Sequence, residues 1–364
     1  MRVGLDWRPA TGGRGGIPVY VRALADAYAR RFPDDRLLLY AHRLRPRRGT
    51  PPAAARLHAA PLPSRAADVL ARLGVGADRL LGGCDVLHLT DYAFLRPTRA
   101  ALVVTVHDVL FHELPRCYTP GMRRGLSTFV RRAVRDATRL VVPSARTKIA
   151  LVERFGAREE RVDVVPLAPR PFPATGSARL PASGPAPAPR PYVLSVGTLE
   201  PRKNHLRLLA AHRAALAAGA DVDLVVAGAR GWLDDAVVAA LAAAPRVRWE
   251  PSPDDARLAA LLAGATALAY PSLGEGFGLP VVEAMAAGVP VLTSAGTACA
   301  EVAAGAAALC DPYDVDALAD GLRRLVGDAD LRRDLAARGR ARAAALSWEA
   351  TAEGTRAAYA RAVA

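Results

Sequence analysis

The segment Tyr270–Pro290 has the sequence YPSLGEGFGLPVVEAMAAGVP, in which a glycine-rich stretch is followed by a short run of helix-forming residues. The apolar residues Ala267–Tyr270 at its start predict a buried β-strand. Pro280 is typical of the first turn of a helix, and Gly288 and Pro290 are typical of a helix end. The pattern therefore predicts a strand, a glycine loop and a helix in succession.

Glu275 and Glu283 are the only charged residues between Leu258 and Ala300. A buried carboxylate without a partner is costly, so we expect each to bind something. The expected positions are the loop for Glu275 and the first helical turn for Glu283. One interpretation is that Glu283 only stabilises the positive end of the helix and that Glu275 is exposed. A hydroxyl-rich ligand explains the pair better, because a carboxylate accepts two hydrogen bonds from a vicinal diol.

The same alternation of short β-branched runs and Ala/Leu-rich helices extends on both sides of a segment rich in Pro, Gly and Ser, for which we predict a linker at 171–190. Such alternation is typical of parallel strands covered on both faces. The predicted fold class is α/β, with doubly wound Rossmann-like domains at 1–170 and 191–347 and ligands beyond the carboxyl ends of the strands. The expected strands are Val3–Leu5, Leu37–Tyr40, Val86–Leu89, Leu102–Val106, Leu140–Val142, Val162–Val165, Tyr192–Val196, Val222–Ala227, Val247–Trp249, Ala267–Tyr270, Val289–Thr293 and Ala307–Leu309.

A basic pair lies in the segment VLSVGTLEPRKNHLRLLAA, where a predicted strand ends at Gly197 and a helix follows. Arg202 and Lys203 precede that helix, and Asn204 is the expected N-cap. Cationic side chains beside the free N–H groups of a helix start suit a phosphate. A solvated basic loop is the alternative. The position after a strand favours the anion site, as does the use of one of only two lysines among 49 basic residues.

Two further segments follow predicted strands of the first half. The glycine-rich stretch TGGRGGIPVYV could cradle a phosphate through Gly15 and Gly16, although it is not a GxGxxG motif. His107 and Asp108 come directly after a buried strand. A structural histidine and a catalytic one both remain open there.

Charge is divided unevenly along the 364 residues, whose net charge is +14. Residues 1–190 carry 32 Lys and Arg against 15 Asp and Glu, a net +17, while residues 191–364 carry 17 against 20, a net −3. The abundance of Arg, Ala and Pro is typical of a GC-rich genome. The asymmetry between the halves nevertheless indicates an anionic partner for the first half.

Several classes of protein are disfavoured. The four cysteines form no CxxC pair and have no histidine at metal spacing, which favours a reduced cytoplasmic protein without a structural metal. We expect neither a secretory signal nor a transmembrane span. A nucleic-acid-binding protein would need stacking aromatics or a recognisable helix module, and aromatic residues make up only 5% of the chain.

Taken together, these motifs resemble the GT-B glycosyltransferases of the large retaining family 4. The resemblance rests on the E-x7-E pattern within GEGFGLPVVEAMAAGVPV, on SVGTLEPRKN, on HDV after a strand, and on the final SWEATAEGTRAAYARA. It covers nearly the whole chain and implies two domains facing each other across a cleft, with the C-terminal helix 348–364 packing back on the first. Two departures, Pro18 in the first glycine loop and TACAEV in place of Leu-Pro-Glu-Val, bear on the acceptor side.

The resemblance also implies the roles of individual residues. Glu283 would bind the ribose hydroxyls of the donor, and Arg202 and Lys203 would neutralise its diphosphate. Glu275 and the backbone of residues 276–279 would hold the transferred sugar. His107 would contact the transferred sugar and the acceptor. The set implied for catalysis is His107, Glu275, Arg202 and Lys203, and the donor-binding set is Gly15, Gly16, Gly197, Arg202, Lys203, Glu275, Gly276, Phe277, Gly278, Leu279 and Glu283.

The implied reaction is a retaining, front-face transfer of a hexose from a GDP- or UDP-linked sugar, with a mannosyl donor favoured and no cofactor or metal. The acceptor would be a glycan or a lipid-linked glycan. A soluble small-molecule acceptor, a nucleotide-sugar 2-epimerase and an inactive partner subunit are the alternatives. The 2-epimerases do not use this E-x7-E loop, and the intact basic and acidic residues argue against an inactive subunit.

A membrane surface is the last expected partner. Basic residues gather in His42–Gly49 and in Arg116–Arg139. In the second segment, arginines recur near helical spacing beside apolar residues: Arg124, Arg131, Arg135 and Arg139 beside Leu126, Phe129, Val130 and Val134. A basic amphipathic helix is typical of proteins that lie on an anionic membrane. We therefore expect a cytoplasmic enzyme that docks peripherally on the inner face of the cell membrane, without binding nucleic acid.

Overall fold

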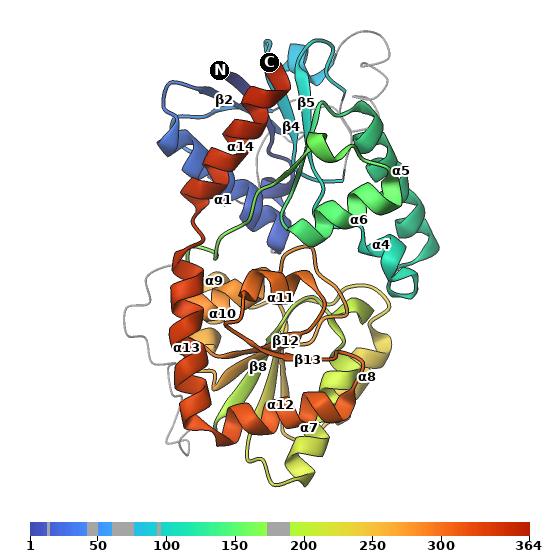
Figure 1. The fold of residues 1–364 in the computed structure, drawn as a ribbon, viewed down its shortest axis with the longest axis vertical. Coiled ribbons are helices and arrows are strands. Elements are labelled where there is room, and N and C mark those ends of the chain that lie inside the picture. The colour runs from blue at the N-terminus through green and yellow to red at the C-terminus, as the bar shows by residue number, and fades with distance from the viewer. Residues whose placement is uncertain (13–14, 42–49, 60–75, 93–95, 173–189) are drawn as a thin grey trace. The chain divides into compact units, whose positions relative to one another are not determined.

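The structure is a computed structural model that describes residues 1–12, 15–41, 50–59, 76–92, 96–172 and 190–364. The chain divides into two compact units, each built around its own parallel sheet (Figure 1). Unit 1 comprises Met1–His112, Pro120–Ala168 and Ser347–Ala364, and unit 2 comprises Glu113–Thr119 and Pro169–Leu346. The expected basic segment His42–Gly49 and nearly all of the expected linker 171–190 lie outside the described residues.

The sheet of unit 1 has the strand order β3-β2-β1-β4-β5-β6-β7 in the described part of the chain, and all pairs are parallel. The six strands expected here are present within one residue at each end. Only β3 was not expected, because its four residues, RLHA, have no β-branched side chain. The strands are β1 (Arg2–Asp6), β2 (Arg36–Ala41), β3 (Arg56–Ala59), β4 (Val86–Leu89), β5 (Ala101–Thr105), β6 (Arg139–Val142) and β7 (Val162–Val164).

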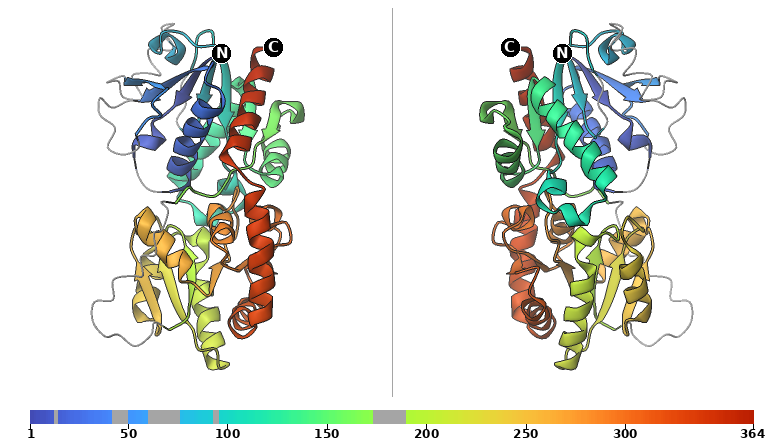
Figure 2. Two further views of the ribbon diagram at one scale, coloured as in Figure 1. Left: turned by 90° about the vertical axis from the view of Figure 1, so that its left-hand side faces the viewer. Right: turned by 90° about the vertical axis from the view of Figure 1, so that its right-hand side faces the viewer.

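The α-helices with residues in unit 1 are α1 (Gly16–Arg31), α3 (Ala77–Leu80), α4 (Leu110–Glu113), α5 (Pro120–Asp136), α6 (Ala145–Phe155) and α14 (Trp348–Val363). Ser347 caps α14, since its side chain accepts a hydrogen bond from the amide of Ala350 at 3.1 Å. The helix lies beside α1 in this unit (Figure 2). Thr351 in α14 donates to the carbonyl of Pro166 at 2.8 Å, which fixes this last helix to the N-terminal part of the chain.

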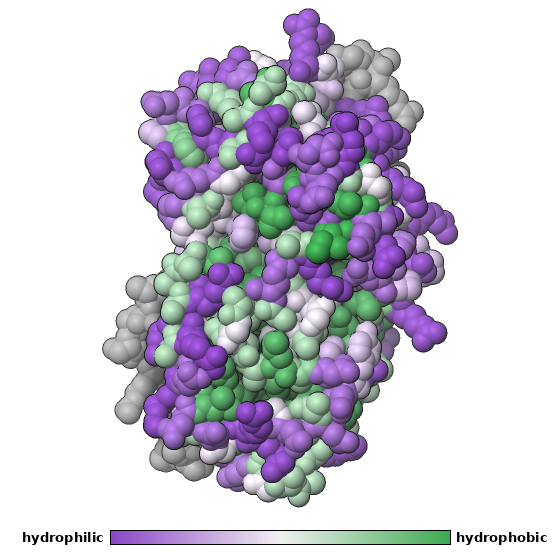
Figure 3. Space-filling view, viewed as in Figure 1, coloured by the Kyte–Doolittle hydropathy of each residue, from purple (hydrophilic) through white to green (hydrophobic). Residues whose placement is uncertain are grey.

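Helix α5 differs from its expected role in one respect. Arg139 was expected to continue the helical spacing of its arginines, but α5 ends at Asp136 and Arg139 begins β6, so this part of the expectation is wrong. Phe129 and Val130 are buried within unit 1, and the Phe129 ring packs edge-on against Tyr92 at 5.5 Å, so part of the apolar side of α5 belongs to the core. The exposed face is hydrophilic (Figure 3), and Arg124 and Arg131 lie on it.

The sheet of unit 2 has the order β10-β9-β8-β11-β12-β13, again parallel throughout the described residues. All six expected strands are present, with ends shifted by two residues at most. The strands are β8 (Tyr192–Val196), β9 (Asp223–Ala227), β10 (Val247–Glu250), β11 (Ala267–Tyr270), β12 (Val291–Ser294) and β13 (Ala308–Cys310). The helices are α7 (His205–Ala217), α8 (Asp235–Ala243), α9 (Asp255–Ala263), α10 (Leu279–Ala286), α11 (Ala298–Ala303), α12 (Val315–Gly327) and α13 (Ala329–Ala344).

The helices of unit 2 bury both faces of this sheet. One apolar cluster joins α7, α8 and α12 to the strands, and the other joins α9, α10 and α11. The strand β11, whose four residues are all buried, therefore lies in the middle of the unit. The glycine-rich loop that follows its carboxyl end belongs to the candidate site.

Candidate functional site

The loop after β8 places Arg202 and Lys203 in a single 3-10 turn, Pro201–Lys203, directly before α7. Asn204 follows with a left-handed backbone (φ 64°), and its side chain does not cap the helix. Its amide instead donates to the carbonyls of Pro271 and Pro312 at 3.0 and 2.7 Å. The expected N-cap is therefore wrong in its contacts, because this side chain joins the loop after β8 to the loops after β11 and β13.

Glu275 lies on the loop after β11 and pairs with both cations of the first loop. Its Oε2 is 2.7 Å from Nη1 of Arg202, and its Oε1 accepts from Nζ of Lys203 at 2.7 Å and from the hydroxyl of Tyr270 at 2.9 Å. The side chain of Glu275 is 9% exposed, which excludes the interpretation of a solvated loop residue. The structure thus brings together the three residues expected at the diphosphate and the sugar.

A second carboxylate, on Glu200, also binds Arg202. Glu200 is buried, and its Oε1 accepts from Nη2 of Arg202 at 2.5 Å. The Nη1 of Arg202 also donates to the carbonyl of Gly274 at 2.8 Å. The guanidinium is therefore held from three sides, and its orientation is set before any ligand binds.

Charge balance in this cluster keeps Glu275 ionised. Burial by itself would raise the pKa of Glu275, but Arg202 and Lys203 outweigh it and lower the pKa to about 2. Burial and the Glu275 charge raise the pKa of Tyr270 well above its usual value, so its hydroxyl remains a donor. The arrangement can accept a sugar hydroxyl at the carboxylate and an anion at the two cations.

Glycine is required where backbones meet around the site. A Cβ on Gly228, which follows β9, would lie 1.8 Å from the carbonyl oxygen of Gly197. Gly278 precedes α10 with φ 104°, and a Cβ there would lie 2.7 Å from the sulfur of Cys299. The expected donor-binding residues 276–279 therefore form a bend that leads into α10, with Phe277 and Leu279 buried.

Glu283 lies in the second turn of α10 rather than the first, so it is too far along the helix to stabilise its N-terminus. Its side chain is 1% exposed, and its Oε1 accepts a hydrogen bond from Nε of Arg170 at 3.1 Å. Burial raises the pKa of Glu283, and Arg170 opposes that rise. The partner of this carboxylate is thus a residue that the sequence did not indicate.

His107 in unit 1 follows β5 and donates from Nε2 to the carbonyl of Thr90 at 2.8 Å. The ring of Tyr20 meets it edge-on, with centroids 5.3 Å apart. Burial lowers the pKa of His107, so the ring is neutral and its Nδ1 is an acceptor. Asp108 accepts from the amide of Leu110 at 3.1 Å and so has a structural contact at the start of α4.

The first glycine loop lies partly outside the described residues, which include Gly12, Gly15 and Gly16 but not residues 13 and 14. Gly15 precedes α1 with φ 149°, a value that disfavours other residues, and Gly16 begins the helix. Pro18 lies in the first turn of α1, where its missing N–H needs no partner. The departure at Pro18 is therefore compatible with the helix.

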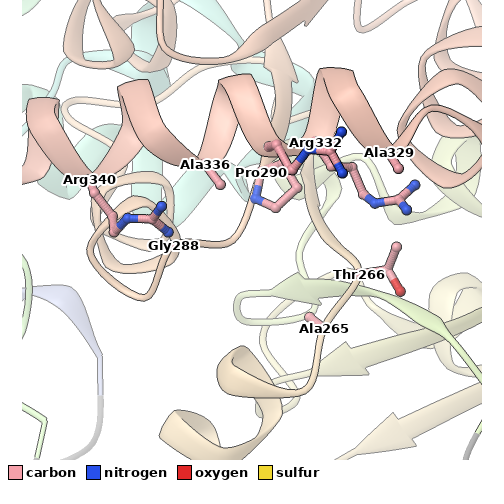
Figure 4. A pocket seen from close by; sticks show the side chains of 9 residues that line it. Ala265, Thr266, Gly288, Pro290, Ala329, Arg332, Ala336 and Arg340 are labelled. Atoms are coloured by element: carbon pink, nitrogen blue, oxygen red, sulfur yellow. The ribbon is translucent and has the colours of Figure 1, made fainter.

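A surface pocket of about 670 Å³ lies elsewhere in unit 2 (Figure 4). Thr266 and Pro290 on its wall precede β11 and β12, so it opens at the amino ends of the strands. Ligands of doubly wound sheets bind at the other edge, where Glu275 lies. No expected site residue lines this pocket, whose wall comprises Ala265, Thr266, Gly288, Pro290, Ala329, Arg332, Arg333, Ala336 and Arg340.

Three residues of the unit 2 site were missed from the sequence. Glu200 stands two residues before Arg202, and Tyr270 is the last residue of a predicted strand, so both carried a positional signal. Arg170 carried none, because it stands beside the Pro-rich linker and 113 residues before its partner.

Two protein families match the chain. The family described as Glycosyl transferases group 1 matches residues 177–342, and Glycosyltransferase Family 4 matches residues 14–168. The chain is 30% identical over 261 residues to O-antigen chain mannosyltransferase B from Escherichia coli, a match that covers 68% of this chain and 67% of that protein.

Solved structures match over nearly the full length. Sucrose-phosphate synthase from Thermosynechococcus elongatus has a TM-score of 0.75 at 21% identity, covering 99% of this chain and 98% of that one. The Anabaena protein HepE, solved in complex with UDP and glucose, has a TM-score of 0.71 at 17% identity, with 98% of both chains covered. At these identities the likeness establishes the fold.

Proposed function

This chain belongs to the family 4, group 1 glycosyltransferases and is a transferase enzyme of the GT-B fold class, and we propose that it is a retaining hexosyltransferase that uses a nucleoside-diphosphate sugar. The observation that carries the proposal is the cluster of Arg202, Lys203 and Glu275, which unites a carboxylate with two cations at the carboxyl ends of β8 and β11. A sugar diphosphate has the complementary groups, hydroxyls on one side and negative charge on the other.

Arg202 and Lys203 would bind the diphosphate and stabilise the charge that grows on it as the glycosidic bond breaks. Because Glu200 and Gly274 already orient Arg202, little reorganisation is needed during the reaction. Glu275 would then accept hydrogen bonds from the transferred hexose, and Glu283 from the ribose. The backbone of residues 276–279 would line the sugar.

Retention would follow from a front-face displacement. The acceptor oxygen bonds to the anomeric carbon on the side from which the phosphate leaves, and its proton passes to a phosphate oxygen. Glu275 is unsuited as a nucleophile, since Arg202 and Lys203 lower the pKa of its carboxyl and so make the carboxylate less basic. His107 would contact the sugar and the acceptor from unit 1. The anomeric configuration of the product, measured by NMR, tests this stereochemistry, and an inverted product would contradict it.

We also propose that transfer needs no metal ion. Two cationic side chains already face the expected diphosphate position, where other enzymes use a divalent ion. Activity measured after dialysis against EDTA should match that with added magnesium. Full loss that magnesium or manganese restores would contradict the proposal.

Two of the comparisons bear on the identity of the donor and of the acceptor. The Anabaena structure contains UDP, and the E. coli relative is named as a mannosyltransferase of O-antigen chains. On this support we propose a GDP- or UDP-linked hexose as the donor, with mannose favoured, and a glycan or lipid-linked glycan as the acceptor in polysaccharide biosynthesis. A small-molecule acceptor is the second candidate. Among the described residues, no helix is both long and apolar enough to span a bilayer.

Thermal unfolding with a panel of nucleotides and nucleotide sugars tests the donor directly. A specific ligand at 100 times its dissociation constant stabilises the folded protein by about 2.7 kcal/mol. UDP or GDP and the matching sugar nucleotide should raise the melting temperature, whereas AMP at equal concentration should not. A panel without any shift at millimolar concentration would contradict the proposed function.

A further inference from the structure

Glu283 depends on one side chain for its charge balance. The carboxylate is 1% exposed, and in the described part of the chain Arg170 is the residue that hydrogen-bonds to it, through Nε at 3.1 Å. Arg170 is itself only 13% exposed. When a buried carboxylate has a single guanidinium as its partner, removal of that guanidinium strongly affects both the protonation and the orientation of the carboxylate.

Arg170 is held in place at its other end. Its Nη1 donates to Oδ1 of Asp255, in the first turn of α9, at 2.5 Å, and its guanidinium carbon lies 5.5 Å from the centre of the Phe172 ring. The guanidinium therefore bridges α9 and α10, and Nε points at Oε1 of Glu283. Because Arg170 binds Oε1 of Glu283, Oε2 is the oxygen that this arginine leaves for another donor.

The pKa of Glu283 depends on the same two neighbours, Arg170 and Asp255. Burial raises the pKa of Glu283 and Arg170 opposes the rise, while the negative Asp255 adds to it. Helix α10 carries no other ionisable side chain. The described elements packed against it carry Tyr270 in β11, Cys299 and Glu301 in α11, and Asp330, Arg332, Arg333, Asp334, Arg338, Arg340 and Arg342 in α13. Without Arg170 the pKa of the buried Glu283 carboxyl would rise further, so more of it would be protonated at a given pH and it would lose part of its capacity to accept hydrogen bonds.

We propose that Arg170 is a positioning residue for the donor nucleotide, which holds Glu283 as an oriented carboxylate and leaves Oε2 for the ribose hydroxyls. This role rests on the proposed function, since it assumes that Glu283 binds ribose. Arg170 immediately precedes the expected linker 171–190. The start of the segment that connects the two sheets would therefore take part in donor binding.

Calorimetric titration with UDP, GDP and inorganic pyrophosphate between pH 6 and pH 9 tests the role. Arg170→Ala should bind the preferred nucleotide about tenfold or more weakly at pH 7, as expected for the loss of a charged hydrogen bond. The deficit should shrink as the pH rises, because the carboxyl is then ionised without help. Arg170→Lys, which keeps the charge, should restore most of the affinity, and pyrophosphate, which has no ribose, should bind both variants like the wild type.

Arg246→Ala is the matched control, since it removes one arginine that pairs with Asp221 and Asp223, away from Glu283. It should bind as the wild type does. If Arg170→Ala does not fold, as judged by circular dichroism, Arg170→Gln is measured in its place.

The outcomes separate the two hypotheses. If the wild type binds neither nucleotide, the proposed function fails and the role of Arg170 with it. If the wild type binds but Arg170→Ala binds equally at every pH, or loses pyrophosphate to the same extent as nucleotide, only the role of Arg170 is overturned.

Discussion

At the scale of single residues, the two glutamates of the E-x7-E pattern have different partners. Glu275 is ionised by two cations that belong to the expected diphosphate site, whereas Glu283 is paired with Arg170 and otherwise buried in α10. The pKa of the first is lowered and that of the second is raised. Two carboxylates eight positions apart thus have separate environments and, we expect, separate ligands.

Loss of either cation should weaken donor binding and turnover by tens- to hundreds-fold. Arg202→Ala and Lys203→Ala each remove a charge-assisted hydrogen bond, which contributes about 1.5–3 kcal/mol. Steady-state kinetics with varied donor concentration measures the effect. Lys148→Ala is the control, because Lys148 lies in unit 1 and pairs there with the exposed Glu159. Wild-type donor kinetics in both site variants would contradict the phosphate role.

Substitution of the two glutamates should separate nucleotide binding from sugar transfer. Glu283→Ala should weaken binding of free nucleoside diphosphate, because the ribose loses its acceptor. Glu275→Ala should bind the free nucleotide as well as the wild type or more tightly, since Arg202 and Lys203 are released from it, yet it should transfer sugar poorly. Calorimetry and turnover on both variants distinguish the roles, and equal losses of nucleotide affinity would show that the assignment is wrong.

At the scale of elements, α14 is joined to the sheet of unit 1 by a buried chain of hydrogen bonds. The hydroxyl of Tyr359 lies 2.7 Å from Nδ1 of His88, whose Nε2 lies 2.7 Å from Oγ1 of Thr105, which in turn contacts the hydroxyl of Tyr20 at 2.9 Å. Burial lowers the pKa of His88 to about 3, so the ring is neutral and uses one nitrogen as donor and one as acceptor. The chain ends at the ring that packs against His107.

Tyr359→Phe should lower the free energy of unfolding by about 1–3 kcal/mol, because it leaves a ring nitrogen of His88 buried without its partner. Urea denaturation measures the loss. Val363→Ala, at a position that is 48% exposed on the same helix, should change stability by less than about 0.5 kcal/mol. Equal stability of Tyr359→Phe and the wild type would show that this hydrogen bond makes no net contribution.

At the scale of the whole molecule, the charge split of +17 against −3 remains the main indication of the acceptor. Because Phe129 and Val130 of α5 are buried while Arg124 and Arg131 are exposed, we expect attachment through this helix to be mainly electrostatic. Such attachment contributes about 1 kcal/mol for each basic residue and is screened by salt. It would suit an enzyme that extends a lipid-linked glycan and then dissociates.

Cosedimentation with vesicles tests that form of docking. Binding to anionic vesicles is expected at low salt and should fall by about tenfold or more at physiological salt, while neutral vesicles should not bind. Arg124→Glu/Arg131→Glu, on the exposed face of α5, should reduce it, with the exposed pair Arg323→Glu/Arg333→Glu of unit 2 as the control. Absence of binding at low salt, or equal binding to neutral vesicles, would favour a soluble small-molecule acceptor.

The sequence by itself determined the features that depend on residues close together in the chain, namely the strands and the loop and helix after β11. Twelve apolar runs predicted twelve of the strands, because burial on both faces leaves a continuous local signal, and glycine and proline marked the loop and helix after β11. The grouping of Arg202, Lys203 and Glu275 was expected from their positions after strands, since the carboxyl ends of parallel strands meet at one edge.

Only the tertiary structure decided which side chains meet across long separations. The side chain of Asn204 binds two distant loops instead of its own helix, the apolar face of α5 packs inward, and Arg170 reaches Glu283 across 113 residues. The physical reason is the same in each case. Local pattern specifies which groups need a partner, whereas the partner is fixed by packing between elements that no spacing rule connects.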